Sequence, residues 1–406
     1  MSGAGVDLER FREGARRWLD GQAERRPAPT GPETRRWGDG SDSVAVFPTA
    51  DPAEERARAG AASEWQRRKF DAGYGAITWP PEFGGAGLTP AHERVFTAEE
   101  RHFRTPEPSE LFAVTIGLVA PTIAAHGTAD QQRRFIRALL RTDLLACQLF
   151  SEPAAGSDLA SVSCRAERDG DGWVLNGQKV WSSGAGLAHY GEAICRTDPA
   201  LPRHRGLTAF LVPLDAGGVE VRPIRQMTGG ASFNEVFLTD VRIPDDLRLG
   251  AVGDGWRVAL TTLGFERSGG SRHGSPGGSF GQLVALARNL GVTGDPVVRQ
   301  ELARVFSAGR ILAFLDARVR GAARAGQPPG PEGSIRKLAW TANLTRTGEL
   351  AAAMLGPAVT ADTGRWGTFA WTEHLLGAPG YRIAGGSDEI QRTIIAERVL
   401  GLPKGP

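Results

Sequence analysis

The stretch CQLFSEPAAGSDL, Cys147–Leu159, lies where the hydrophobic pattern of the chain changes from a helical to a strand-like period. It predicts a strand that delivers small and hydroxyl-bearing residues into a loop around Gly156. Backbone N–H groups and hydroxyls in such a loop can hydrogen-bond an electron-rich ring or a carbonyl group. An ordinary strand-to-loop transition has the same pattern, and the stretch taken alone favours that simpler interpretation.

Helical periodicity precedes this stretch, over residues 1–145. Apolar residues recur at helical spacing near the N-terminus, at Leu8, Phe11, Ala15, Trp18 and Leu19. Further helices are expected over residues 64–70 and 89–101, where Thr89 can cap and Pro90 suits the first helical position. The longest apolar run, residues 111–125, is too short to cross a bilayer and predicts a buried core helix.

The strand-like pattern extends over residues 146–249. Asp169–Gly172 is expected to form a turn, and the Asn176–Gly177 pair after Trp173–Leu175 predicts a hairpin. Later strands are expected over residues 207–212, 219–223 and 233–238, which together indicate a compact β domain.

Helical periodicity returns from residue 250 to the end, residue 406. Asp254 can cap a helix that runs to Glu266, and helical patterns follow over residues 281–290, 297–326, 334–355 and 389–400. The order helical, β, helical predicts three domains, 1–145, 146–249 and 250–406.

Composition limits the classes of function. The chain has 406 residues and a formal net charge of +2, so a nucleic-acid partner is not indicated. Three cysteines without a paired spacing, and charged residues close to the N-terminus, predict a cytoplasmic protein with no signal peptide and no structural zinc. No metal-ligand spacing, Rossmann glycine motif or P-loop is present in the sequence.

Three further segments carry groups that could take part in chemistry. In Gln178–Gly184, Trp181 next to hydroxyls can stack beside a flat cofactor, although a core tryptophan is as good an interpretation. Two glycines and a hydroxyl before a helix, over 385–392, form an anion-binding helix start or a plain capped helix.

Glu266 is the candidate base. Residues 259, 263 and 266 share a helix face, and the first two are apolar, so the carboxylate is expected to point inward. Burial raises a carboxyl pKa because desolvation disfavours the charged form, and a raised pKa suits a general base near neutral pH. A surface ion pair with Arg267 at a helix end is an equal alternative at this point.

In three places the sequence resembles the acyl-CoA dehydrogenase family. Residues 149–158 (LFSEPAAGSD), 177–184 (GQKVWSSG) and 386–392 (GSDEIQR) are similar to the family's signatures, in the same order. The three together are far more specific than any one, and the similarity covers nearly the whole chain. It favours the functional interpretation of each segment over the simpler one.

The resemblance implies an α+β fold with an N-terminal helical domain, a middle β-barrel-like domain and a C-terminal four-helix bundle. It implies FAD as cofactor, bound between these domains and a neighbouring subunit of a homodimer or homotetramer. By position, the flavin neighbours are Phe150, Ser151, Trp181, Ser183, Phe280, Ser387 and Glu389. Ser157 and Arg267 match residues near the acyl-CoA substrate.

Two departures from the family pattern matter. Most members carry the catalytic glutamate just before the last signature, where this chain has Gly385. A minority, including isovaleryl-type enzymes, place the base before an arginine on an earlier helix, as at Glu266. Many members also have an FAD-binding arginine where this chain has Gly277, and Arg272 is a candidate substitute.

The implied reaction is α,β-dehydrogenation of an acyl-CoA thioester, with electrons passed to an electron-transferring flavoprotein. Glu266 would remove the α-proton. Two alternatives remain open from the sequence: a flavin oxidase or monooxygenase on the same fold, and a non-catalytic subunit of a hetero-oligomeric dehydrogenase.

Overall fold

The computed structural model describes residues 7–27, 37–38, 41–47, 52–107, 110–268, 278–324 and 330–404. Contacts divide the chain into two compact units. Unit 1 comprises Met1–Gly31, Ala50–Ile224 and Ala231–Phe265, and unit 2 comprises Pro32–Thr49, Arg225–Gly230 and Glu266–Pro406. The boundaries of the three predicted domains are not tested by this division and stay a prediction.

The helices of unit 1 confirm the helical periodicity of the N-terminal region. They are α1 (Leu8–Asp20), α2 (Pro52–Asp71), α3 (Pro90–Glu100), α4 (Glu110–Val114), α5 (Ala120–His126) and α6 (Ala129–Arg141). Thr89 and His92 form a reciprocal cap at the start of α3. Buried Ala15 and Leu19 of α1 pack with Trp65 of α2, as the 3.6-residue spacing predicts.

The predicted core helix over residues 111–125 is buried but is not a uniform α-helix. A π-helical turn, Thr115–Val119, separates α4 from α5. Pro121 lies directly after this turn, and proline has no N–H to donate while its ring crowds the carbonyl four residues earlier. Widening the preceding turn accommodates that loss, and Val119 and Ile123 still reach the core with no exposed surface.

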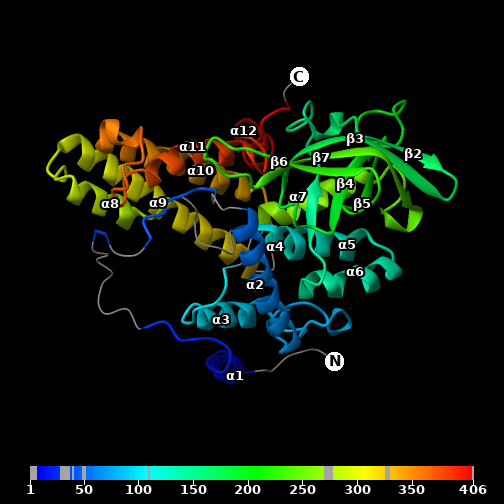
Figure 1. The fold of residues 1–406 in the computed structure, drawn as a ribbon, viewed down its shortest axis with the longest axis horizontal. Coiled ribbons are helices and arrows are strands. Elements are labelled where there is room, and N and C mark those ends of the chain that lie inside the picture. Colours follow the sequence, from blue (N-terminus) through cyan, green and yellow to red (C-terminus); the bar gives the residue numbers. More distant parts are fainter. Residues whose placement is uncertain are drawn as a thin grey trace. The chain divides into compact units, whose positions relative to one another are not determined.

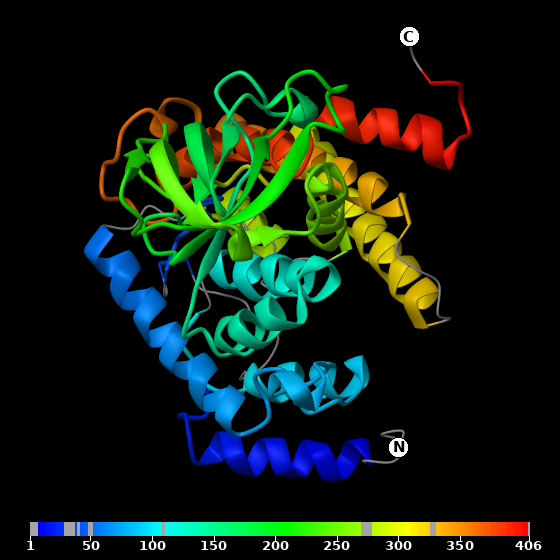
Figure 2. The same cartoon turned by 90° about the vertical axis from the view of Figure 1, so that its right-hand side faces the viewer.

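Unit 1 also contains a mixed sheet of eight strands (Figure 1). The strands are β1 (Ala146–Leu149), β2 (Arg165–Asp169), β3 (Gly172–Ser183), β4 (Tyr190–Arg196), β5 (Leu207–Pro213), β6 (Val219–Ile224), β7 (Phe233–Pro244) and β8 (Arg248–Leu249). Their order is β6-β7-β3-β2-β4-β5-β8, and β1 pairs in parallel with β4. Helices α5 and α6 lie beneath the sheet in Figure 2. The ring of Phe135 in α6 meets that of Tyr190 in β4 edge-on.

The predicted hairpin at Asn176–Gly177 is wrong. Strand β3 continues through both residues, and the hairpin turn is the Asp169–Gly172 turn, where Gly170 takes a left-handed φ of 59°. The Asn176 amide donates to Asp240 Oδ1 at 3.0 Å, and Asn176 Oδ1 accepts from the Asp240 N–H at 2.9 Å. These cross-strand bonds, with a register shift against β7, make the Asn-Gly pair a β-bulge rather than a turn.

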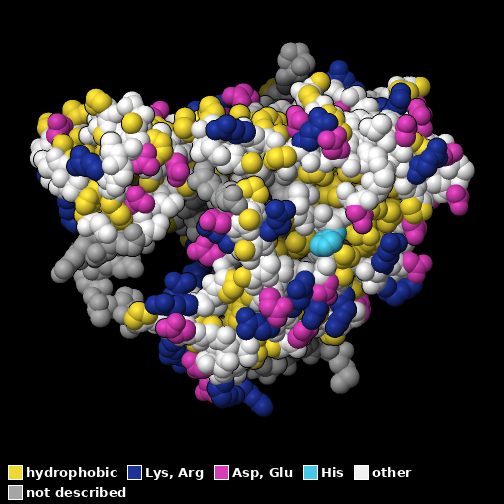
Figure 3. All heavy atoms as spheres, in the orientation of Figure 1, with side chains coloured by type: hydrophobic (Ala, Val, Ile, Leu, Met, Phe, Trp, Pro, Cys, Tyr) yellow, Lys and Arg dark blue, Asp and Glu magenta, His cyan; other side chains and the backbone are white. Residues whose placement is uncertain are grey.

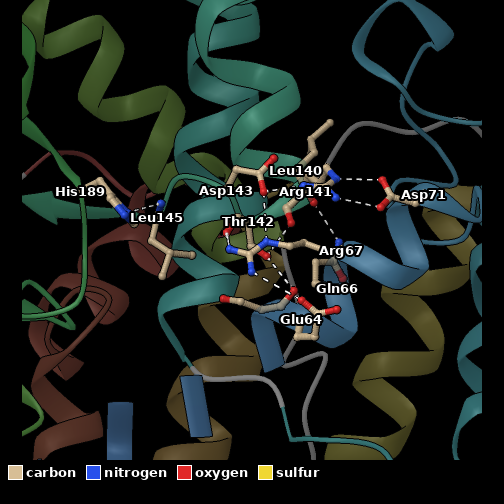
Figure 4. Close-up of polar contacts among 11 residues, drawn as sticks. Glu64, Gln66, Arg67, Asp71, Leu140, Arg141, Thr142, Asp143, Leu145 and His189 are labelled. Carbon is tan, nitrogen blue, oxygen red and sulfur yellow. Dashed lines mark hydrogen bonds and ion pairs between the residues drawn. The ribbon is translucent and has the colours of Figure 1, made fainter. Parts of the chain in front are cut away.

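A network of hydrogen bonds and ion pairs holds the connection between α6 and β1 in place (Figure 4). Arg141 pairs with both carboxylate oxygens of Asp71 at 2.8 Å, and Arg67 donates to Asp143 at 3.0 Å. Thr142 between them is a left-handed C-cap with φ 62°. The Leu145 N–H then donates to His189 Nδ1 at 3.0 Å, which sets the start of β1 against the residue that precedes β4.

Unit 2 is helical. Its elements are the end of α7 (Gly255–Ser268) from Glu266 onward, α8 (Phe280–Asn289), α9 (Pro296–Arg324), α10 (Glu332–Leu355), α11 (Ala370–Ile383) and α12 (Asp388–Ile394). Leu283, Leu286, Leu350 and Trp371 are buried in its core. Figure 1 shows α9, α10 and α11 running side by side, and α10 contacts both of its neighbours. The predicted α+β class, with helical regions before and after a β region, is confirmed.

The surface mixes charges of both signs. Figure 3 shows Lys, Arg, Asp and Glu side chains interspersed with apolar ones on the visible face, as the net charge of +2 leads one to expect. No described helix is long and apolar enough to cross a membrane. The predicted cytoplasmic location stays a prediction.

Candidate functional site

The loop that follows β1 is held from the interior by Lys179. The Lys179 ammonium is fully buried and donates to Phe150 O at 3.2 Å, Glu152 Oε1 at 2.8 Å and Ile194 O at 2.7 Å. The Val180 N–H donates to Ser151 O at 2.9 Å. The backbone at Phe150 and Ser151 is therefore fixed by strand β3, which places the two predicted flavin neighbours on one supported segment.

Glu152 completes this support. Its Oε2 accepts from the Ser163 N–H at 2.6 Å and the Ser163 hydroxyl at 2.8 Å, and its Oε1 accepts from the Cys164 N–H at 2.9 Å. Burial alone raises the pKa of Glu152, but the Lys179 charge and these hydrogen bonds outweigh it and hold the pKa below its usual value. Such a fully hydrogen-bonded buried pair is rigid, and removing one partner leaves an uncompensated charge.

Trp181 is presented on the outside of the same strand. Its side chain is 60% exposed, and its φ of 60° puts a bulky residue in the left-handed region. Phe233 meets its ring edge-on at 6.1 Å. An exposed tryptophan on strained backbone indicates a constraint other than packing, because strain of this kind concentrates at ligand sites.

The residues beside Trp181 fit a flavin. The neighbouring Ser182 is buried, and among the described residues its hydroxyl has no hydrogen-bond partner. Ser183, which the sequence pointed to, is only partly buried. An exposed aromatic face beside the partly exposed Ser183 suits a flat heterocycle with polar edges. Ser157, the predicted substrate residue, is exposed on the loop that continues from Glu152.

The candidate base lies in unit 2, together with the glycine that replaces the usual glutamate. A Cβ atom built on Gly385 would lie 3.0 Å from Glu266 Oε1. The Glu266 carboxylate thus occupies the space into which a side chain at position 385 would project. Gly385 also has a φ of +67°, which strains any residue with a Cβ.

The Gly385–Gly386 turn is held by two side chains. Gln391 Nε2 donates to the carbonyl oxygens of Gly385 and Gly386, both at 3.0 Å. The Lys337 ammonium donates to Gly386 O at 2.6 Å. The pKa of Lys337 is lowered, first by burial, against the opposing charges of Asp388, Glu266 and Glu389. A charged group therefore sits close to the candidate base.

The turn leads into α12, whose first residues are two of the predicted cofactor neighbours. Ser387 is the N-cap of α12, and its hydroxyl accepts from the Ile390 N–H at 3.4 Å. Backbone and Ser387 hydrogen bonds lower the pKa of the exposed Glu389. Asp388 is buried and pairs with Arg382 at 2.7 Å, which ties this helix start to the end of α11.

The remaining predicted residues are dispersed. Phe280 begins α8, is 37% exposed and packs against Phe306 at 5.3 Å between ring centroids. The side chain of Arg267 and all of Gly277 and Arg272 lie outside the described residues. The cofactor and substrate roles of these residues stay predictions.

One buried group was missed by the sequence interpretation. Glu192 in β4 has no exposed surface, and the Thr262 hydroxyl of α7 donates to its Oε1 at 2.7 Å. Thr262 also meets the Thr122 hydroxyl of α5 at 3.0 Å. Burial raises the pKa of Glu192 to about 8, with the Thr262 hydrogen bond opposing. Its only signal in the sequence was a charged residue within an otherwise apolar strand.

Comparisons with known families match three consecutive parts of the chain. These are the acyl-CoA dehydrogenase N-terminal domain over residues 44–143, the middle domain over 147–241 and the C-terminal domain over 253–400. Acyl-CoA dehydrogenase IpdE1 of Mycobacterium tuberculosis is 44% identical over 345 residues, which cover 84% of this chain and 88% of that protein. Its namesake in Mycolicibacterium smegmatis is 36% identical, covering 98% and 99%.

Solved structures with a similar fold are also found. The Tcur3481–Tcur3483 steroid ACAD has a TM-score of 0.74 and 27% identity, and the match covers 98% of both chains. The ChsE4–ChsE5 complex from Mycobacterium tuberculosis has a TM-score of 0.70 and 26% identity, covering 100% of both.

Proposed function

Because the chain belongs to the acyl-CoA dehydrogenase family of FAD-dependent oxidoreductases, we propose that it dehydrogenates an acyl-CoA thioester between the α and β carbons, with Glu266 as the base. The observation that carries the role of Glu266 is the 3.0 Å separation between its Oε1 and the Cβ position of Gly385. A glutamate at position 385 would project towards the place that the Glu266 carboxylate occupies, so Glu266 would be the proton acceptor that Gly385 cannot be.

Different residues of this chain would have different roles in the reaction. Glu266 would accept the α-proton, which a positioned base of this kind accelerates by about 10²–10⁴-fold. FAD, when bound, supplies acceptance of the hydride from the β carbon. Trp181 would lie beside the flavin face, and Ser183 would hydrogen-bond its edge. The Lys179–Glu152 pair, joined at 2.8 Å, would keep the loop at Phe150 and Ser151 from moving.

The proposed substrate class is a CoA thioester with a bulky, ring-containing acyl group. Similarity to a steroid ACAD over nearly the full chain supports it. Electrons would pass to an electron-transferring flavoprotein, the expected acceptor in this family.

Assembly has two candidates. A homodimer or homotetramer is expected from the family. The second candidate is a complex with a related but different chain, in which this chain could be the non-catalytic member. Two structures similar to this chain are named as pairs, Tcur3481–Tcur3483 and ChsE4–ChsE5. The presence of Glu266 beside Gly385 favours a catalytic chain in either assembly.

The test is the visible spectrum of the purified chain before and after anaerobic addition of acyl-CoA thioesters. A useful panel is butyryl-CoA, isobutyryl-CoA, cyclohexane-1-carbonyl-CoA and a CoA thioester with a steroid ring in its acyl group. Flavin absorbance that bleaches fastest with the ring-containing thioesters supports the proposal. Fastest bleaching with butyryl-CoA contradicts the substrate class. Absence of bound flavin makes the non-catalytic role the better account, and reoxidation in air without an acceptor protein indicates an oxidase.

A further inference from the structure

Lys337 has no role assigned so far, but its side chain holds the Gly385–Gly386 turn by a hydrogen bond. It projects from α10, and its ammonium donates to Gly386 O at 2.6 Å and approaches Arg382 O at 3.5 Å. Partial removal of its ammonium group from water is unfavourable unless hydrogen bonds or opposite charges compensate it. Two carbonyl oxygens and nearby carboxylates provide that compensation here.

The hydrogen bond from Lys337 holds a turn that lies next to the candidate base. Gly386 O is bound by Lys337 and Gln391 together, at 2.6 and 3.0 Å. The preceding residue, Gly385, is the one whose Cβ position lies 3.0 Å from Glu266 Oε1. The backbone of this turn therefore lies beside the carboxylate.

The charge of Lys337, as well as its hydrogen bond to the turn, can affect Glu266. The charged groups that face Lys337 are Asp388 and Glu389 from α12, Glu266 from α7 and Arg382 from α11. Asp388 is already engaged by Arg382 at 2.7 Å and by the Thr341 hydroxyl at 3.3 Å. Glu389 is exposed, so water screens its charge. Glu266, only partly buried but beside the same turn, is the carboxylate near Lys337 with a proposed chemical role.

We propose that Lys337 is a positioning residue for Glu266: its ammonium holds the Gly385–Gly386 turn beside the carboxylate, and its charge favours the ionised, proton-accepting form. This inference rests on the proposed role of Glu266 as the base. An opposite charge nearby stabilises a carboxylate against protonation. With Lys337 in place, Glu266 stays ready to accept a proton at lower pH than it would otherwise.

The experiment measures the rate of anaerobic flavin bleaching from pH 5 to pH 9, with the panel thioester that reduces the flavin fastest. In the wild type the rate falls at low pH as the base becomes protonated. Lys337→Met keeps the alkyl stem and removes the charge, so this acid limb is expected to move up by about one pH unit. Lys337→Gln, which keeps a donor for Gly386 O without the charge, is expected to move it likewise. Lys337→Arg is expected to leave it near the wild-type position.

The matched control is Arg336→Met. Arg336 is the adjacent residue of α10 and pairs with Asp316 of α9 instead, so this variant loses the same charge without touching the turn. Its acid limb is expected to coincide with that of the wild type. Bound-flavin absorbance and the thermal midpoint establish that each variant is folded, and Lys337→Gln replaces Lys337→Met if the latter is not.

Failure of this inference is distinguishable from failure of the proposed function. If both neutral Lys337 variants keep the wild-type acid limb while Glu266→Gln is inactive, the role of Lys337 is overturned and that of Glu266 stands. If Arg336→Met shifts the limb as far as Lys337→Met, the effect is general electrostatics and the positioning role is overturned. If Glu266→Gln bleaches at the wild-type rate, the base assignment itself fails.

Discussion

Replacing Glu192 by glutamine should change how the stability of the protein depends on pH. The pKa of Glu192 is raised from 4.5 to about 8 by complete burial, so the folded state holds a proton that the unfolded state releases above about pH 4.5. Stability carried by this group is therefore complete at low pH and declines as the pH rises towards 8. At about 1.4 kcal/mol per unit, the decline between pH 5 and pH 8 is at most about 4 kcal/mol.

Glutamine cannot ionise, and its carbonyl can still accept from Thr262. Glu192→Gln should therefore match the wild type near pH 5 and become the more stable protein as the pH rises. For a chain of this length, about 4 kcal/mol corresponds to a gain of about 5 °C in thermal midpoint at pH 8 relative to pH 5.

The assay is thermal unfolding of the flavin-bound protein at unit intervals from pH 5 to pH 9. The control is Glu220→Gln, which makes the same chemical change on β6, where Glu220 pairs with Arg222 at 2.7 Å and its pKa is lowered. That variant should gain no stability with rising pH. A constant difference between Glu192→Gln and wild type at every pH would show that Glu192 is not a buried neutral acid at pH 7.

Three further substitutions test other parts of the account. Lys179→Met should destabilise the protein by about 3–5 kcal/mol, measured as a lower thermal midpoint, because it leaves the Glu152 carboxylate buried without its partner; the double variant with Glu152→Gln should recover part of the loss, and no recovery would contradict the pairing argument. Gly385→Ala should lower the bleaching rate with flavin still bound, because its Cβ would lie 3.0 Å from Glu266 Oε1 at a φ of +67°, strain of about 1–3 kcal/mol; an unchanged rate would show that the carboxylate has free space. Trp181→Ala should weaken FAD retention about fivefold in a dilution assay, since stacking of this kind contributes on the order of 1 kcal/mol, while an unchanged retention would remove Trp181 from the cofactor site.

The sequence predicted the periodic elements of the fold well. Helix α1 and strands β5 and β6 lie where the spacing of apolar residues put them. Helix α11 was not predicted, because Gly377, Pro379 and Gly380 are typical of loops. In the structure, Cβ atoms at Gly377 and Gly380 would crowd Val46 and Phe47. These glycines permit close packing between distant segments, which local pattern cannot reveal.

The Asn176–Gly177 error has a similar cause. The dipeptide favours a tight turn in isolation, but a partner 64 positions away, Asp240, supplies the hydrogen bonds that make it a bulge. Tertiary contacts overrode the local preference.

The sequence predicted which segments form the candidate site, but not the contacts that hold these segments in place. The pattern around Phe150 and Trp181 identified the segments, but not that Lys179 and Glu152 hold them together inside the sheet. The family resemblance led us to expect the base at Glu266 in place of position 385. The sequence could not show that the two positions lie next to each other in the folded chain. Glu192 and Lys337 carry no motif, since their significance depends on burial and on neighbours from other elements.

The role of Glu266 as the base is tested by the rate of anaerobic flavin bleaching in Glu266→Gln, with the panel thioester that reduces the wild-type flavin fastest. Glutamine keeps the shape of the side chain and cannot accept the proton. We expect this variant to bind FAD as the wild type does and to bleach about 10²–10⁴-fold more slowly. Bleaching at a rate close to that of the wild type, with FAD bound, would contradict the assignment of Glu266 as the base.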